Sequence, residues 1–191
     1  LYYKVNIELT EEVAKIAKKQ GVNQFIFMSS IIVYGDSTNS QRIISKDTQP
    51  TPSDFYGDSK WQAEQTLNKL STPSFNIVIL RPPMIYGKGS KGNYPRLAKL
   101  SKTLPIFPKF ENQRSMLHID NLCEFLKQII LLEKSGLYCP QNTEYVNTSE
   151  LVKKIANIHG KNVYLTKLFN PMIKWLFNID TVKKVFGNLV Y

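Results

Sequence analysis

The stretch from Phe25 to Gly35 reads FIFMSSIIVYG, and the stretch from Asp54 to Gln65 reads DFYGDSKWQAEQ. The first begins as an apolar run suited to a parallel strand buried on both faces, and it delivers Ser30 to the strand end. The second reads as a helix that carries Tyr56 and Lys60 four residues apart, so both side chains lie on one face. A strand followed by a helix in this way is the repeating unit of a parallel α/β sheet.

These three polar residues suggest proton transfer at an alcohol or a ketone. A tyrosine phenol has a pKa of about 10, which is too high for a base at neutral pH. A cation within reach favours the phenolate, so we expect Lys60 to lower the pKa of Tyr56. Ser30 would hydrogen-bond the same substrate oxygen and fix its position. Each residue alone also has an ordinary explanation, since Ser30 could simply cap a turn and Lys60 could be a surface lysine.

The rest of the chain alternates helices and strands, as expected for a parallel sheet. Apolar spacing and capping residues predict the following elements. Helices are expected over Tyr3–Lys19, Phe55–Leu70 (capped by Ser53 or Asp54), Pro95–Lys102, Asp120–Lys134 and from a Thr148 or Ser149 cap to His159; strands over Phe25–Ser29 and Asn76–Leu80; and a loop over Gly35–Ser53.

Five motifs in order resemble the extended short-chain dehydrogenase/reductase family, in its sugar-nucleotide epimerase/dehydratase branch. They are Asn6 on a helix, SSIIVYG from Ser29, YGDSK from Tyr56, LRPPMIYGKG from Leu80 and RSMLHIDNL from Arg114. A lone YxxxK pair arises often by chance, whereas five motifs at the family's spacing are specific. The resemblance covers nearly the whole chain.

The resemblance implies the C-terminal part of a Rossmann-type doubly wound parallel sheet plus a small α/β substrate-binding lobe. We expect a partial NAD-binding domain over residues 1–86 and mainly the lobe over 87–191, with 115–142 returning to the Rossmann sheet. The family's glycine-rich turn, which holds the dinucleotide pyrophosphate, has no counterpart here. Roughly three βα units of about thirty residues are therefore expected to be missing, and the fragment alone is expected to be inactive.

The resemblance also implies roles for individual residues. Ser30, Tyr56 and Lys60 would be catalytic. NAD, with NADP left open, would meet Asn6, Ser29, Tyr56, Lys60 and Pro83. The substrate would meet Ser30, Tyr34, Met84, Asn93 and Arg114, whose guanidinium suits a diphosphate. Met84 replaces an asparagine that touches substrate in many UDP-galactose 4-epimerases, and packing would also explain a methionine there.

The residues after Ser30 narrow the reaction. Related 4,6-dehydratases carry Asp-Glu at this point to eliminate water, whereas Ile31 and Ile32 cannot move a proton. We therefore expect NAD-dependent epimerisation at C4 of a UDP-hexose or UDP-N-acetylhexosamine through a 4-keto sugar, in surface-polysaccharide biosynthesis. A sugar-nucleotide 4-ketoreductase and an epimerase of a lipid-linked sugar are alternatives. A non-catalytic nucleotide-binding relative is an alternative of another class.

The charged residues, cysteines and histidines limit the kinds of partner that the sequence supports. The net charge of +10 first suggests nucleic acid, but lysine is spread along every helix without an arginine-rich block, so no nucleic-acid partner is expected. Cys123 and Cys139 have no CxxC spacing, which predicts free, mostly buried thiols in the cytoplasm. The two histidines, His118 and His159, have no acidic or cysteine neighbours at ligand spacing, so no metal is expected.

Two surfaces raise the question of larger partners. In the family, the helices bearing Asn6 and Tyr56 pair with their copies in a homodimer, and the apolar stripes here allow it. The tail from Leu168 to Val190 combines aromatic residues with lysines. We interpret it as a lobe helix packed on the core, and a membrane-surface helix is the less favoured reading. No apolar run reaches the roughly 18 residues of a membrane span.

Overall fold

A computed structural model describes residues 1–36, 43–45 and 47–191. It separates into two compact units. The first unit comprises residues 1–35, 46–83 and 120–141, and the second comprises 36–45, 84–119 and 142–191. Residues 37–42 and 46 of the expected Gly35–Ser53 loop lie outside the described residues. The assignment of the units to a cofactor domain and a substrate lobe stays a prediction.

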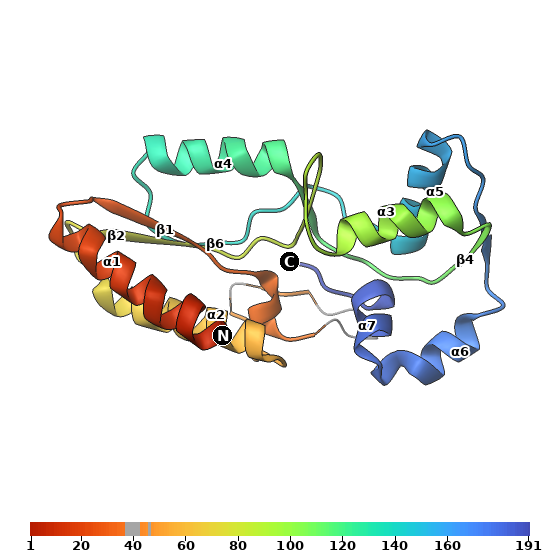
Figure 1. The fold of residues 1–191 in the computed structure, drawn as a ribbon, viewed down its shortest axis with the longest axis horizontal. Coiled ribbons are helices and arrows are strands. Elements are labelled where there is room, and N and C mark those ends of the chain that lie inside the picture. The colour runs from red at the N-terminus through yellow and green to blue at the C-terminus, as the bar shows by residue number, and fades with distance from the viewer. Residues whose placement is uncertain (37–42, 46) are drawn as a thin grey trace. The chain divides into compact units, whose positions relative to one another are not determined.

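The first unit is built on a parallel sheet of three strands (Figure 1). Its order is β1 (Gln24–Met28), β2 (Asn76–Leu80) and β6 (Gly136–Tyr138). Phe27 of β1 faces Ile79 of β2 in the register. The predicted parallel α/β architecture is confirmed, and β1 and β2 match their predicted ranges to within one residue.

Helices cover both faces of this sheet. The π-helical turn η1 (Lys4–Leu9), α1 (Thr10–Lys19) and α2 (Phe55–Leu70) lie on one face, and α4 (Ile119–Leu131) lies on the other (Figure 1). The cause is the two-residue period of β2. Ile77 and Ile79 point to one face, where they pack with Ala14, Ala63 and Leu67. Val78 and Leu80 point to the other face, where they pack with Ile129.

The second unit contains two small parallel pairs of strands. β3 (Met84–Tyr86) pairs with β5 (Met116–His118), and β4 (Ile106–Pro108) pairs with β7 (Tyr164–Thr166). The helices are α3 (Asn93–Thr103), α5 (Thr148–Ile158), α6 (Asn170–Trp175) and α7 (Asp180–Phe186). One buried cluster joins α3, α5 and the β4–β7 pair through Leu97, Phe107, Val152, Ala156 and Val163.

The helix cap predicted for α5 is wrong by one residue. The Asn147 side chain accepts the hydrogen bond from Glu150 N at 3.1 Å, so Asn147 is the N-cap. Thr148 and Ser149 are buried instead, where their hydroxyls meet Asn112 and the backbone of Phe110. The hydroxyls that were predicted to cap the helix therefore form hydrogen bonds with residues distant in the sequence.

The two cysteines form no disulfide, but they are less buried than expected. Cys123 is exposed on α4, which corrects the expectation of a buried thiol, and Cys139 is half-buried. Cys123 lies on the solvent side of α4 because the sheet side of this helix is occupied by Ile129, Phe125 and Leu126. Across the described residues, the helices are too short or too polar to cross a bilayer.

Candidate active site

Ser30 lies where β1 ends and the chain turns into the 3₁₀ helix η2 (Ile31–Tyr34). Its Oγ accepts a hydrogen bond from Ile32 N at 3.3 Å, so it does cap the turn. A serine hydroxyl that accepts one bond keeps its proton for donation. Backbone bonds fix the strand end on both sides of Ser30, since Ser29 N donates to Leu80 O at 2.7 Å and Ile31 N donates to Pro82 O at 3.1 Å.

Tyr56 lies in the first turn of α2. The helix begins at an Asp54 cap, whose Oδ1 accepts from Gly57 N at 2.7 Å, as the sequence predicted. The Tyr56 side chain is 36% exposed, and its ring meets the Tyr2 ring edge-on with centroids 5.6 Å apart. Loss of water raises the pKa of Tyr56, and the negative charge of Asp54 and the neighbouring Tyr2 raise it further.

The predicted lowering of this pKa by Lys60 is wrong for this structure. Lys60 Nζ donates to the backbone oxygen of Met28 at 2.9 Å and lies over the Phe27 ring, 4.6 Å from its centroid. Its distance to the centroid of the Tyr56 ring is 6.0 Å. The ammonium is therefore directed to the end of β1. Burial lowers the pKa of Lys60, while the negative charge of Glu64 acts in the opposite direction.

The structure nevertheless brings the three predicted catalytic residues into one neighbourhood. Lys60 and Tyr56 occupy the same face of α2, and the carbonyl that binds Lys60 is two residues before Ser30. Asn6 joins them from η1, because its Nδ2 donates to Ser59 Oγ at 2.9 Å and Ser59 Oγ donates to Tyr56 O at 2.8 Å. π-helical turns such as η1 are frequent at functional sites.

A buried ion pair next to this site was missed by the sequence reasoning. Glu64, four residues after Lys60, is 1% exposed and pairs with Arg81, whose Nη2 is 2.5 Å from Glu64 Oε2. The guanidinium also donates to the Tyr34 hydroxyl and stacks between the rings of Tyr34 and Trp61. Arg81 therefore braces the end of β2. The available signal for Glu64 was a carboxylate between Ala63 and Leu67, both of which the helix buries.

This network occupies two side chains that the sequence assigned to ligands. The Ser29 hydroxyl, predicted to meet the cofactor, donates to Glu64 Oε1 and is buried. The Tyr34 hydroxyl, predicted to meet the substrate, accepts from Arg81 and is buried as well. Pro83 is also buried. Contacts from these three residues to ligands stay predictions.

The remaining predicted substrate residues belong to the second unit. Met84 packs against the core cluster that contains Leu97. Asn93 is exposed as the first residue of α3. Arg114 is buried, its Nη1 donates to Gly187 O at 3.1 Å, and burial lowers its pKa to about 10. Their roles in binding substrate stay predictions.

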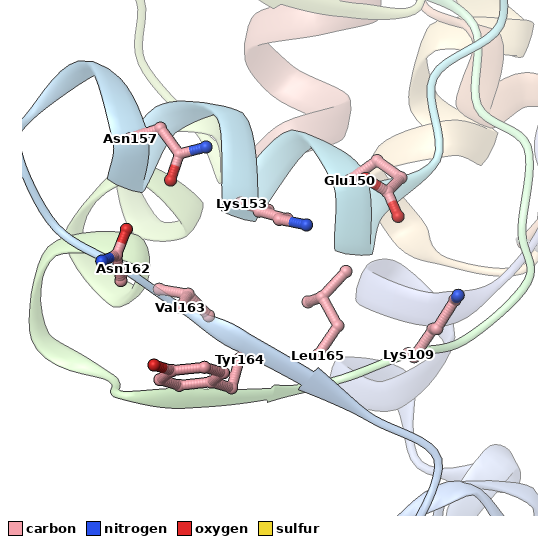
Figure 2. A pocket seen from close by; sticks show the side chains of 8 residues that line it. All are labelled: Lys109, Glu150, Lys153, Asn157, Asn162, Val163, Tyr164 and Leu165. Carbon is pink, nitrogen blue, oxygen red and sulfur yellow. The ribbon is translucent and has the colours of Figure 1, made fainter.

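A pocket in the second unit lies between α5 and β7 (Figure 2). Glu150, Lys153 and Asn157 line it from one face of α5, and Lys109 approaches from the chain just after β4. None of the substrate residues predicted from the sequence lines this pocket.

A hydroxyl, a phenol and an ammonium gathered at the end of a parallel strand are the arrangement that the resemblance to the short-chain dehydrogenase/reductase class implied. The model of the NAD dependent epimerase/dehydratase family matches residues 1–138. The chain belongs to this family, whose cofactor is NAD.

Two curated relatives are 4-epimerases. The chain is 36% identical to the UDP-glucose 4-epimerase of Vibrio cholerae over 99% of its own length and 56% of the relative. It is 30% identical to the N-acetyl-alpha-D-glucosaminyl-diphospho-ditrans,octacis-undecaprenol 4-epimerase of Escherichia coli O157:H7, over 90% of the chain and 53% of the relative. The chain thus spans about half the length of these relatives.

Solved structures confirm the fold. The UDP-N-acetylglucosamine 4-epimerase of Bacillus cereus superposes with a TM-score of 0.71 at 20% identity, covering 83% of the chain and 57% of that protein. The Thermus thermophilus UDP-glucose 4-epimerase in complex with NAD gives 0.71 at 17% identity, covering 86% and 57%. These likenesses establish the Rossmann-type architecture.

The described residues fit one end of the cofactor. Lys60 offers an ammonium with three donors, of which Met28 O takes one. The hydroxyls of a nicotinamide ribose are suitable acceptors for the other two. Tyr56 remains partly exposed beside it.

Proposed function

We propose that this chain supplies the proton-transfer half of an NAD-dependent 4-epimerase acting on a UDP-hexose or UDP-N-acetylhexosamine. The single observation that carries the proposal is the shared neighbourhood of Ser30, Tyr56 and Lys60 at the end of β1. Two relatives that match 90% or more of the chain are 4-epimerases, which supports the choice of reaction.

In the proposed mechanism, Tyr56 removes the proton from the sugar 4-hydroxyl and later returns it. Ser30 donates to the same oxygen and holds it within reach of the phenol. Bound NAD would accept the C4 hydride and give it back on the other face of the 4-keto sugar. Lys60 would hold the nicotinamide ribose, and any approach of its ammonium to Tyr56 would favour the phenolate.

The high pKa of Tyr56 has a consequence for this mechanism. With its pKa above the ordinary value, Tyr56 is a neutral phenol at neutral pH and is ready to return a proton. Removal of a proton needs the phenolate, so we expect the rate to rise with pH until Tyr56 is ionised.

The substrate carrier is open to a second proposal. The Escherichia coli relative acts, by its name, on a sugar linked to undecaprenol through a diphosphate. The same proton transfer would serve a lipid-linked N-acetylhexosamine, because the reacting C4 is remote from the carrier. With either substrate, we propose that the protein is cytoplasmic, and its two free cysteines are in keeping with this location.

We also propose that a second copy covers α1. Val5, Leu9, Val13 and Ile16 recur at helical spacing and are each about half exposed, while Ala14 on the opposite side is buried in the core. An apolar stripe of this length is typical of a protein interface. A homodimer through the helices that bear Asn6 and Tyr56, which are η1 with α1 and α2, would remove this stripe from water.

The test uses the protein extended to the length of its relatives. It is incubated with UDP-glucose, UDP-GlcNAc and catalytic NAD, and the anomeric protons are followed by NMR. We expect a galacto epimer without added reductant, and no turnover in Tyr56→Phe, whose fold is checked by circular dichroism. Turnover only with a 4-keto sugar and reduced cofactor would replace the epimerase by a ketoreductase. Normal rates in Tyr56→Phe would refute the assignment of the base.

A further inference from the structure

The second unit carries an exposed apolar ridge formed by Leu168, Met172, Trp175 and Ile179. Met172 and Trp175 are three residues apart on α6, Leu168 lies in the turn before this helix, and Ile179 follows the 3₁₀ turn η3 (Leu176–Asn178). Leu168 is 79% and Trp175 is 80% exposed, which is unusual for such large apolar side chains. α6 and α7 follow one another near the C-terminal end of the chain (Figure 1).

The opposite side of the same segment is firmly packed. Ile173 and Phe177 are buried and form a cluster with Phe110, against which Val182 and Phe186 also pack. The tail therefore packs on the core of the second unit, as expected, but it does so as two short helices and a 3₁₀ turn rather than as one helix. The ridge is the second apolar side of a segment whose first side is already satisfied, so folding of the described chain does not require it.

Basic residues outnumber acidic ones around the ridge, although the exposed Asp180 follows Ile179 directly. Lys167 and Lys174 are exposed and lie within the same segment. The sequence has no aspartate or glutamate between Glu150 and Asp180, whereas Lys161, Lys167 and Lys174 fall inside the last part of that interval. Lysines beside an exposed tryptophan match the anionic headgroup region of a bilayer.

We propose that this ridge docks on the surface of an anionic lipid bilayer. Trp175, Leu168 and Met172 would enter the boundary between headgroups and acyl chains, and Lys167 and Lys174 would meet lipid phosphates. The protein would bind peripherally, without crossing the bilayer. The buried apolar area and the attraction between lysines and anionic lipids would both contribute to the binding free energy. The proposal stands apart from the proposed reaction, because its test measures no turnover.

The test follows the fluorescence of Trp175. Trp61 is the other tryptophan, so Trp61→Phe makes Trp175 the sole reporter. We expect a blue shift and protection from aqueous quencher on addition of vesicles containing phosphatidylglycerol, and little change with phosphatidylcholine alone. In co-sedimentation, Lys167→Ala with Lys174→Ala should weaken binding about thirtyfold, from the usual contribution of a lysine near an anionic surface. Trp175→Ser should abolish it.

Matched variants separate the ridge from the overall charge. Lys99→Ala with Lys102→Ala removes the same charge from α3, and Ile158→Ser removes an equally exposed apolar side chain at the end of α5. Both should bind vesicles normally. Equal losses in the two lysine pairs would refute a local site. A Trp175 already buried before vesicles are added, whether by self-association or by another part of a longer chain, would also overturn the proposal.

Discussion

Asp54 both caps α2 and raises the pKa of Tyr56. Asp54→Asn separates these effects, since asparagine is an equally good N-cap but carries no charge. We expect the alkaline rise of kcat/KM to move to lower pH, because removal of a negative charge makes the phenolate easier to form. The control is Asp58→Asn, which removes a charge from the same turn of the helix. The Asp58 carboxylate accepts hydrogen bonds from Tyr3 and Gln62. An unchanged profile in Asp54→Asn would mean that another group limits the rate.

The ion pair between Glu64 and Arg81 is nearly inaccessible to water, so its loss should be costly. Glu64→Gln keeps the shape of the side chain but leaves the guanidinium without its counter-charge. We expect a loss of about 3–5 kcal/mol in the free energy of unfolding, measured by urea denaturation. The exposed pair of Lys15 and Glu11 provides the contrast, and Glu11→Gln should cost no more than about 0.5 kcal/mol. Similar losses in the two variants would contradict this account.

The turn that ends η2 depends on a glycine. Gly35 has a φ of 94°, and a Cβ there would come within 2.7 Å of the backbone oxygen of Thr51. Gly35→Ala should therefore cost more than the roughly 1–3 kcal/mol of backbone strain alone. Gly21 has a φ of 77° with open space around it, so Gly21→Ala measures strain without the clash. Thermal unfolding should rank Gly35→Ala as the less stable variant, and the reverse order would contradict the packing described here.

Long elements were predictable from the sequence, and short ones were not. The limits of α2 could be predicted from the Asp54 cap before it and Pro73 after it, and those of β2 from its uninterrupted apolar run. The strands of the second unit contain three residues each, too few for any period to appear. Long-range polar contacts were equally hidden. The pairing of Glu64 with Arg81 depends on how α2 lies against β2, which no local pattern contains.

The candidate site divides in the same way. The motifs predicted that Ser30, Tyr56 and Lys60 belong together, and the structure places them in one neighbourhood. The motifs could not predict the protonation of Tyr56, because the Lys60 ammonium is bound by the backbone carbonyl of Met28. A backbone acceptor leaves no mark in the sequence. Sequence motifs can therefore identify which residues form a site, whereas the charges and pKa values of those residues depend on the fold.

The exposed stripe of Val5, Leu9, Val13 and Ile16 runs along η1 and α1. Its residues are those that a helix would normally bury, yet Ile7, Ala14 and Ala17 already supply the contacts to the core. The stripe is therefore surplus to folding of the first unit. A second copy that presents the same stripe would bury it symmetrically, which is the commonest arrangement in soluble oligomers.

A charge in this stripe should dissociate the proposed dimer. Leu9→Lys places an ammonium among Val5, Val13 and their copies, and forfeits about 1.5–3 kcal/mol of apolar burial for each side chain removed. With two copies of the change, the dissociation constant should rise by at least about a hundredfold, as measured by sedimentation velocity over a dilution series. Leu132→Lys, at a residue of similar exposure beyond α4, should leave the dimer intact. A protein that is monomeric before either change, or one that responds equally to both, would show that something other than a second copy covers α1.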